Sequence, residues 1–409
     1  MFFGRKRQPV TRSHRSSSVL PLLGVAFLSS ACALVGSSRA IAVESELMAP
    51  NVRDPVNPAI PHDSDSPAPT LPRFFSCFGA GLTNPQQALH YQLLIWHNHP
   101  LGRDKLVGIR RIHPNLKTFM YRELFSILRT ETPLEESVGN WDWINREHPE
   151  WFQKDTQGRR VEVPDYPGQW VMDVRNRQWQ DFWIQQTLKD VVDGGWDGVF
   201  ADDALTTLRA HKLPPLQGYP DDASLQDAVY GFLVRITETF HAAGKRVIAN
   251  VSNSYDYPDL WSKWLAATDG ILEEHFAGES WGWGKDVAER QLEALHEAER
   301  QQKWALCVTY GGWQETEKME TSLAAYLIAA GRTALWTYRP YDKADEPAWH
   351  SSWAVPLGSP LAGAEKIGGV WFRRFEGGTV VLNTSTTPQS VAVNGQVILL
   401  KPRQGKVLT

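Results

Sequence analysis

Two acidic residues occupy the same position in two similar segments of the chain. The first segment, GGWDGVFADD, covers residues 194–203, and the second, TDGILEEHF, begins at Thr268. In each, an Asp-Gly pair precedes a short apolar run that ends in two carboxylates, and five residues after the aspartate stand Asp202 and Glu274. Buried parallel strands are apolar on both faces and carry functional polar groups at their carboxyl ends. The matched spacing therefore predicts two strands that present carboxylates to a common space.

Only one member of each acidic pair is expected to face that space. Successive side chains alternate between the two sides of a strand, and the matched offset selects Asp202 and Glu274. Asp203 is then expected to cap the next helix or to support the site. Cleavage of a glycosidic bond needs two carboxylates across a pocket, because one protonates the leaving oxygen while the other attacks the sugar or activates water. We assign Asp202 as nucleophile or base and Glu274 as general acid.

Further residues at strand ends are candidates for substrate contacts. The strands of a parallel barrel end at one mouth, so their last residues lie close together. Flat aromatic rings stack on sugars, and the glycine-rich segment GESWGWGK after Glu274 predicts exposed tryptophans. The residues selected on these grounds are His97, Tyr121, Glu123, Asp203, Asn250, Tyr310, Tyr338, Trp281 and Trp283.

The elements that would position these residues alternate along the chain. Short apolar runs, typical of buried strands, are separated by segments of helical periodicity such as 224–243 and 286–302. Eight strands with intervening helices favour a closed (β/α)8 TIM barrel over an open sheet. The strands are predicted at residues 74–78, 92–96, 117–121, 198–201, 246–249, 270–272, 304–309 and 333–338.

The barrel is predicted to occupy residues 73–350, after which the pattern changes. Residues 351–409 contain alternating runs separated by Glu-Gly-Gly at 376–378 and Asn-Gly at 394–395, which indicate β-hairpins. The predicted fold class is therefore α/β, a (β/α)8 barrel followed by a small C-terminal antiparallel β domain.

The N-terminal segment predicts export. Residues 1–18 are basic and serine-rich, residues 19–35 are apolar, and Ala-Ile-Ala at 40–42 provides the small residues of a cleavage site. Residues 1–42 are thus a signal peptide or membrane-anchor leader, and the proline-rich residues 43–72 a disordered linker. Cleavage near Ala42, retention as an anchor and lipid attachment at Cys32 all remain open. We expect the protein to be secreted, periplasmic or attached to the cell envelope.

Composition and motifs argue against other classes. Loss of residues 1–42 removes six basic residues and no acidic ones, which takes the net charge from −4 to −10 and disfavours nucleic-acid binding. No HExxH motif or Cys/His spacing indicates a catalytic metal, and no GxSxG motif indicates a serine nucleophile. Cys77 and Cys307 fall on different predicted strands and are expected to be buried thiols. We expect no metal, no cofactor and a carbohydrate partner, with the oligomeric state open.

Four segments resemble one known family. DGVFADD, the upstream MDVRNRQWQDFW, DGILEE and the closing GGVWFRRFEGGTVVLNTS are similar to the hypothetical glycosyl hydrolase family 15 and, more distantly, to endo-α-1,4-polygalactosaminidases. The resemblance implies a TIM barrel in which Asp202 on the fourth strand and Glu274 on the sixth are catalytic, with Asn250 and Asp173 lining the site. Related barrels carry Asn where this chain has Asp203, so a shared role for Asp203 stays open.

Together these features predict an exported glycoside hydrolase that cleaves O-glycosidic bonds of an oligo- or polysaccharide. The alternative from another class is a non-catalytic carbohydrate-binding barrel of the cell envelope, whose acids only hydrogen-bond sugar hydroxyls. A structural envelope protein is a third reading, and it predicts a marked loss of stability when either acid is replaced. Retaining and inverting chemistry both stay open, since they differ in a distance between carboxylates that a sequence does not contain.

Overall fold

Eight parallel strands form the centre of the computed structural model, which describes residues 69–76, 85–97, 100–129, 137–282, 284, 286–340 and 349–409. Phe74 pairs with Trp336 of the last strand, whose backbone N–H donates to the Arg73 carbonyl at 3.1 Å, so the sheet closes on itself. The predicted (β/α)8 barrel is therefore confirmed. In sheet order the strands are β1 (Phe75–Ser76), β2 (Leu93–Trp96), β3 (Lys117–Glu123), β6 (Gly198–Asp202), β7 (Arg246–Asn250), β8 (Gly270–Glu273), β9 (Trp304–Tyr310) and β10 (Ala334–Arg339).

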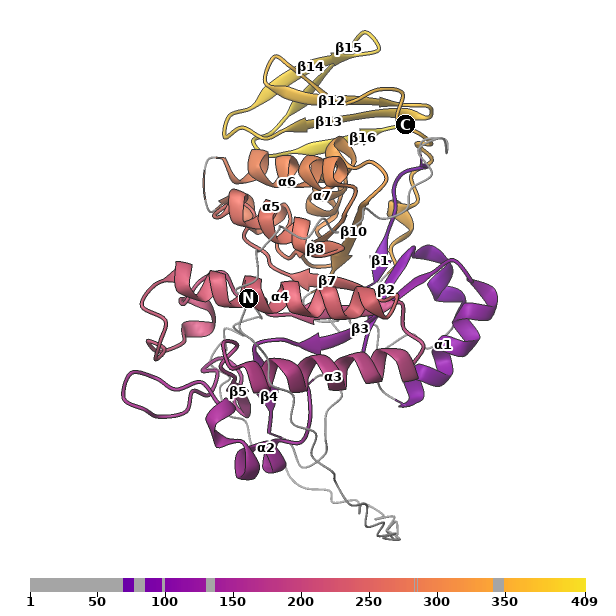
Figure 1. The fold of residues 1–409 in the computed structure, drawn as a ribbon. Coiled ribbons are helices and arrows are strands. Elements are labelled where there is room, and N and C mark those ends of the chain that lie inside the picture. Colours follow the sequence, from indigo (N-terminus) through magenta and orange to yellow (C-terminus); the bar gives the residue numbers. More distant parts are fainter. Residues whose placement is uncertain are drawn as a thin grey trace, which may run out of the picture. The chain divides into compact units, whose positions relative to one another are not determined.

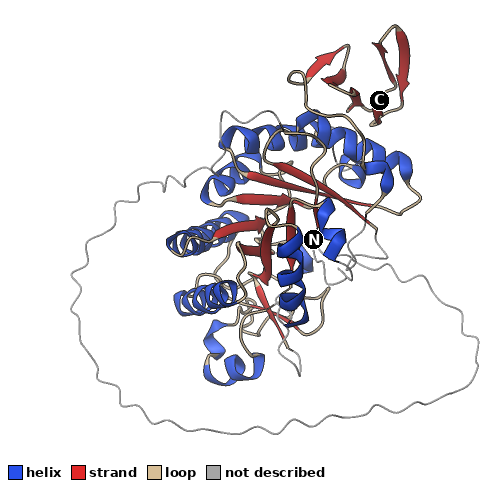
Figure 2. Ribbon diagram, turned by 90° about the vertical axis from the view of Figure 1, so that its right-hand side faces the viewer, coloured by secondary structure: helices blue, strands red, loops and turns tan. Residues whose placement is uncertain are grey.

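Helices surround this sheet on its outer side (Figure 2). Their starts follow from local capping: the Asn176 side chain accepts the first free backbone N–H groups of α3, and Asp221 with Ser224 forms a reciprocal capping box that starts α4. The helices that follow barrel strands are α1 (Pro100–Ile112), α3 (Arg177–Asp193), α4 (Asp222–Ala242), α5 (Pro258–Ala267), α6 (Val287–Gln301) and α7 (Thr316–Ala329).

The long segment between β3 and α3 has structure of its own. It contains α2 (Trp141–Glu147) and an antiparallel pair, β4 (Ser126–Leu128) with β5 (Gln169–Val171). Short 3-10 helices complete the described elements, at Pro85–His90, Pro149–Trp151, Ala210–Lys212, Gly278–Gly282 and Ser351–Trp353.

Every second residue of the strands points into the barrel. These side chains form an apolar cluster separate from the larger core between strands and helices. The Phe119 ring meets the Trp304 ring edge-on at 5.5 Å, and Tyr121 and Tyr310 lie in the same cluster. The barrel is thus filled by side chains up to its mouth, as is usual for this fold.

The two Asp-Gly pairs fix how β6 and β8 sit against their neighbours. The Asp197 carboxylate accepts the Thr118 backbone N–H at 2.8 Å, and the Asp269 carboxylate accepts the Val247 N–H at 2.8 Å. A side chain at Gly198 would come within 2.1 Å of the Arg246 carbonyl oxygen, so only glycine fits there. Both pairs therefore pin one strand to the preceding strand in the sheet.

The C-terminal residues form a small antiparallel β domain, as predicted. Its strands are β11 (Glu365–Ile367), β12 (Val370–Phe375), β13 (Gly378–Asn383) and β16 (Gly405–Leu408) in one sheet, with β14 (Gln389–Val393) and β15 (Gln396–Leu400) paired separately. Figure 1 shows these strands beside α6 and α7. The buried Arg373 guanidinium donates to the carbonyls of Leu327 and Ala330, at 2.8 and 2.6 Å, at the end of α7. It satisfies carbonyls that a helix end leaves without partners.

The observed boundaries differ from the expected ones in one systematic way. Six barrel strands run one or two residues farther than predicted, because polar side chains at their ends find hydrogen-bond partners and the ladder continues. Leu71, inside the predicted linker, is buried and donates its backbone N–H to the Gly358 carbonyl at 3.1 Å. Cys307 is a buried free thiol, whereas Cys77 and the predicted leader lie outside the described residues. Within the described ranges, no helix combines the length and apolar character needed to cross a membrane.

Two glycine substitutions should have opposite effects on stability. Gly198→Ala forces a methyl group against the β7 backbone and should lower the free energy of unfolding by about 2–4 kcal/mol. Gly231→Ala, inside α4 with no atom within 4 Å of the new methyl group, should raise it by about 0.5–1 kcal/mol. Urea titration measures both. The same change in the free energy of unfolding for both variants would contradict the close contact between β6 and β7.

Candidate active site

A ring of polar side chains lies directly above the apolar filling of the barrel. Each member stands two residues after an inward-facing apolar residue of its strand: Asp202 after Phe200, and Glu274 after Leu272. Because side chains alternate along a strand, these residues also point inward. The same spacing brings in Glu123 after Tyr121, Asn250 after Ile248 and Tyr310 after Val308.

The side-chain amide of Asn250 connects the two predicted catalytic carboxylates. Its Nδ2 donates to Oδ1 of Asp202 at 2.8 Å and to Oε2 of Glu274 at 3.0 Å. The two oxygens are therefore at most about 5.8 Å apart, the sum of these lengths, and the 120° angle between amide N–H bonds sets them roughly 5 Å apart. These are the nearest oxygens of the two groups, and their separation favours the short spacing of retaining glycosidases, about 5–5.5 Å between carboxyl groups, over the roughly 6.5–9.5 Å of inverting ones.

Two tyrosines hold the outer oxygens of the pair. The Tyr121 hydroxyl lies 2.6 Å from Asp202 Oδ2 and 2.8 Å from Glu123 Oε1, and the Tyr310 hydroxyl donates to Glu274 Oε1 at 2.8 Å. A tyrosine hydroxyl has a single hydrogen, so it donates to only one of two carboxylates at a time. The arrangement around Tyr121 is therefore best satisfied when one of its two neighbouring carboxyls is protonated.

Asp202 is the carboxyl on which that proton is favoured. Burial raises its pKa to about 7, and the negative charges of Asp203 and Glu274 act in the same direction, against the hydrogen bonds from Tyr121 and Asn250. Two carboxyls this close titrate as a pair. Near neutral pH Asp202 is therefore about half protonated. Burial raises the pKa of Glu274, but the charge of His275 and the hydrogen bonds from Asn250 and Tyr310 outweigh burial and lower that pKa.

Asp203 and Glu273, the other members of the two acidic pairs, have different hydrogen-bond partners. Asp203 has φ +54° and lies 3.1 Å from Nε2 of His211. Burial raises the Asp203 pKa, but the hydrogen bond and charge of His211 reverse this, and the pKa is lowered. Glu273 accepts the Ser254 backbone N–H at 3.0 Å and a longer bond from Gln291. Strand alternation thus separates the two members of each pair as expected.

The remaining predicted residues are placed as follows. The His97 ring lies 4.8 Å from the Tyr121 ring, and the Tyr338 hydroxyl donates to the Gly312 carbonyl at 3.2 Å. Asp173 pairs with Arg175 and accepts from the Tyr219 hydroxyl, so its contacts are within a separate network.

The expected exposure of Trp281 is wrong. Its side chain is 2% exposed and its indole N–H donates to Gln291 at 3.0 Å, because Gln291 reaches out of α6 and ties the segment down. The glycine-rich segment itself does not indicate that an amide of the next helix will bind Trp281. Trp283 lies outside the described residues.

Sequence reasoning missed three residues of the site. Ser252 donates to the Asn250 carbonyl oxygen Oδ1 at 3.0 Å and accepts from the Glu274 backbone N–H at 3.3 Å. His211 binds Asp203, and the Tyr166 ring, from the loop before β5, meets the His211 ring edge-on at 5.7 Å. Burial raises the Tyr166 pKa, and the charges of Asp203 and Glu274 act in the same direction. None of the three sits at a strand end.

The backbone beside the site is unusually strained. Residues directly after β6, β7 and β8 adopt left-handed conformations that disfavour ordinary side chains. Such conformations persist where surrounding contacts impose them, and they concentrate at functional sites. The residues concerned are Asp203, Ser252, Asn253, His275 and Ala277, with φ between +39° and +57°.

Across the part of the chain that the structure describes, no three His, Cys, Asp or Glu side chains are grouped so as to hold a metal ion.

Comparison with known proteins identifies the family of this chain. Residues 110–379, two-thirds of the chain, match the model of the hypothetical glycosyl hydrolase family 15. The chain belongs to this family. Membership in the hypothetical glycosyl hydrolase family 15 makes it a glycoside hydrolase by class, and the matched segment contains both Asp202 and Glu274. No curated protein matches the chain.

Solved structures similar to this family member are glycosidases. The maltogenic α-amylase AmyB of Thermotoga neapolitana is 11% identical, with a TM-score of 0.45 over 82% of this chain and 96% of that one. The α-amylase of H. orenii is 10% identical, with a TM-score of 0.47 over 80% and 91%. A chitinase of Chromobacterium violaceum is 12% identical, with a TM-score of 0.34 over 58% and 68%.

Replacing Asp202 should stabilise the protein in alkaline solution. Its pKa is about 7 in the folded protein and about 3.9 in an unfolded chain, so the folded state loses stability as pH rises from about 4 to 7. At pH 8 Asp202→Asn removes the buried charge and should raise the free energy of unfolding by about 1–3 kcal/mol. At pH 4 this gain should vanish.

Urea titration at both pH values measures this difference, and Asp104→Asn, exposed on α1, is the control. A variant less stable than the wild type at pH 8 would instead favour a structural role for Asp202.

Proposed function

We propose that the protein is an exported glycoside hydrolase whose catalytic carboxylates are Asp202 and Glu274. The observation that carries the proposal is the Asn250 amide, which donates to both groups and spaces them for chemistry across one bond. Two buried carboxyls joined by one neutral amide are costly, so a folded protein retains them only where they serve a purpose.

The spacing supports a retaining mechanism. Asp202 attacks the anomeric carbon while the bond to the leaving oxygen breaks, and Glu274 transfers its proton to that oxygen. Water then attacks the resulting ester, Glu274 takes a proton from it, and Asp202 leaves as a carboxylate. Asn250 and Tyr121 stabilise the charge on Asp202, and Tyr310 orients Glu274. In the free protein the proton favours Asp202 over Glu274, so catalysis in these roles uses the form in which the proton has moved to Glu274.

Reducing-sugar release tests the proposal directly. Polygalactosamine, chitosan, amylose and galactan are incubated with the mature protein, Asp202→Asn, Glu274→Gln and the control Asp104→Asn. We expect release by the wild type and the control and a loss of about 100-fold or more in each carboxyl variant, since general acid–base catalysis alone contributes that much. Circular dichroism confirms that the variants are folded.

The same reactions separate the alternatives. Glu274→Gln should still cleave aryl glycosides with good leaving groups, which need no acid, and Asp202→Asn should not. NMR of the first product should show retention of the anomeric configuration. Inversion would contradict the deduced spacing, and binding of a polymer without release from any of them would make the non-catalytic carbohydrate-binding barrel the better account.

Export rests on the basic, apolar and small-residue order of residues 1–42. When the full chain is expressed with its leader, mass spectrometry of the exported form should find an N-terminus between Ile41 and Glu44. An exported form that keeps the arginines of residues 5–15 would show that the leader is not cleaved.

A further inference from the structure

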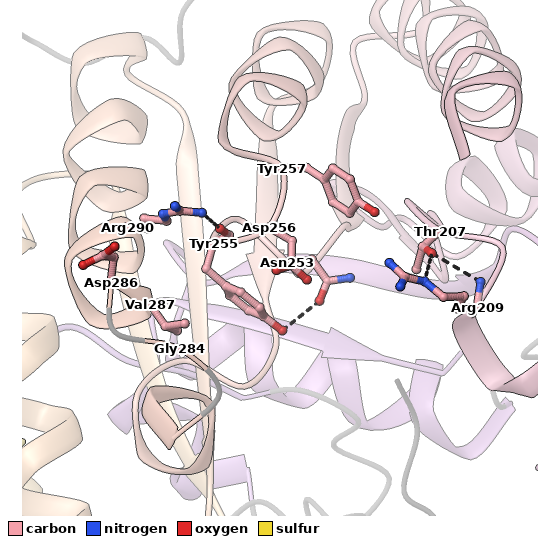
Figure 3. Close-up of a pocket in the computed structure, with 10 residues that line it drawn as sticks. All are labelled: Thr207, Arg209, Asn253, Tyr255, Asp256, Tyr257, Gly284, Asp286, Val287 and Arg290. Carbon is pink, nitrogen blue, oxygen red and sulfur yellow. Dashed lines mark hydrogen bonds between the residues drawn. The ribbon is translucent and has the colours of Figure 1, made fainter. Parts of the chain in front are cut away.

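A separate pocket of about 620 Å³ opens at the mouth of the barrel, among the loops that follow β6, β7 and β8 (Figure 3). Thr207 and Arg209 line it from the first loop, Tyr255 and Tyr257 from the second, and Arg290 of α6 from the third side. Its volume is in the range that accommodates a small ligand of one or two rings. None of the residues assigned to catalysis lines it.

The pocket nevertheless borders the catalytic centre. A small cavity of about 30 Å³ is lined by Asn250, Asp203 and His275, and it shares Thr207 and Asn253 with the larger pocket. The wall between the two spaces is therefore one residue thick.

Two consecutive residues with left-handed backbone conformations have side chains on opposite sides of that wall. Ser252, with φ +46°, donates to Asn250 on the catalytic side. Asn253, with φ +56°, accepts from the Tyr255 hydroxyl at 3.0 Å and donates to Thr206 at 3.2 Å. The left-handed turn after β7 thus sends one side chain to the Asn250 amide and the next to the pocket, as Figure 3 shows for Asn253 and Tyr255.

The lining suits an uncharged, hydroxyl-rich ligand. Two guanidinium groups, Arg209 and Arg290, are balanced by two exposed carboxylates, Asp256 and Asp286. Phosphate or sulfate would be drawn to the arginines but repelled by the acids, whereas a sugar hydroxyl accepts from the former and donates to the latter. Val287 is the one aliphatic side chain among the described lining residues, and the rings of Tyr255 and Tyr257 add flat aromatic surface on which the apolar face of a sugar can rest.

We propose that this pocket is a carbohydrate-binding subsite. It binds one sugar unit of the substrate glycan while a neighbouring glycosidic bond of the same glycan lies at Asp202 and Glu274. The proposal rests on the proposed glycosidase function and adds that the enzyme acts on chains in preference to short glycosides. When one sugar unit is bound in this pocket, the units that follow it along the glycan are positioned at the catalytic centre, on the other side of the wall formed by Asn253 and Thr207.

A chain-length comparison tests the subsite. Disaccharides and hexasaccharides are prepared from the polymer of the panel that the wild type cleaves, and kcat/KM is measured for both. Arg209→Ala, and separately Asp286→Asn, should lower the hexasaccharide-to-disaccharide ratio of kcat/KM about 10-fold, because binding to distant units is lost. The matched controls Arg111→Ala and Asp104→Asn, exposed on α1, should keep the wild-type ratio. An unchanged ratio in both pocket variants would overturn the subsite.

Binding without turnover distinguishes failure of the subsite from failure of the glycosidase proposal. In the Asp202→Asn background, migration is measured through gels that contain polygalactosamine, chitosan, amylose or galactan. Retardation by one polymer that Arg209→Ala abolishes and Arg111→Ala preserves would support the subsite even if the wild type released no sugar. Equal retardation of both, or no retardation in any gel, would overturn it.

Discussion

The register between neighbouring barrel strands is the constraint on which the rest of this structure depends. Asp197 and Asp269 each accept a backbone N–H of the preceding strand, and the glycine that follows allows the chains to approach. A slip of one residue would turn every inward side chain outward. With the register held, Asp202 and Glu274, each five residues beyond its aspartate, arrive at the same level of the barrel. The Asp-Gly pairs lie at the amino ends of β6 and β8. By fixing the register of these strands, they therefore also fix where the acidic residues at the carboxyl ends lie.

The site is assembled at a cost in stability. Asp202 and Glu274 are buried side by side, and burial, together with the charges of Asp203 and Glu274, raises the pKa of Asp202 to about 7. The backbone after three successive strands adopts left-handed conformations without glycine, as at Ser252. The compensation comes from hydrogen bonds between neighbouring strands of the sheet, notably those of Asn250, Tyr121 and Tyr310. A protein selected for stability alone would replace such groups.

The turn after β7 connects catalysis to the recognition of a longer substrate. Ser252 and Asn253 are adjacent in the chain, yet one contacts the amide that spaces the carboxylates and the other lines the second pocket. The balanced charges of that pocket match a neutral glycan better than a charged polymer. Membership in the hypothetical glycosyl hydrolase family 15 defines the class of reaction, and the shape and charge of this mouth would then decide which chains reach it.

The sequence by itself determined the strands, their inward-facing parity and the mouth at which their polar ends meet, because these follow from local periodicity and from the closure rule of parallel βα units. It therefore selected Asp202 over Asp203 and Glu274 over Glu273 correctly as the members that face Asn250. Only the tertiary structure decided the distance between the two carboxylates, since that distance depends on how residues 72 positions apart are brought together by a single amide from a third strand. The same holds for Ser252, His211 and Tyr166, which lie in loops whose paths no periodicity predicts. Trp281, expected at the surface, is buried because its indole N–H donates to Gln291 of α6. The composition of the segment around Trp281 gives no sign of this partner.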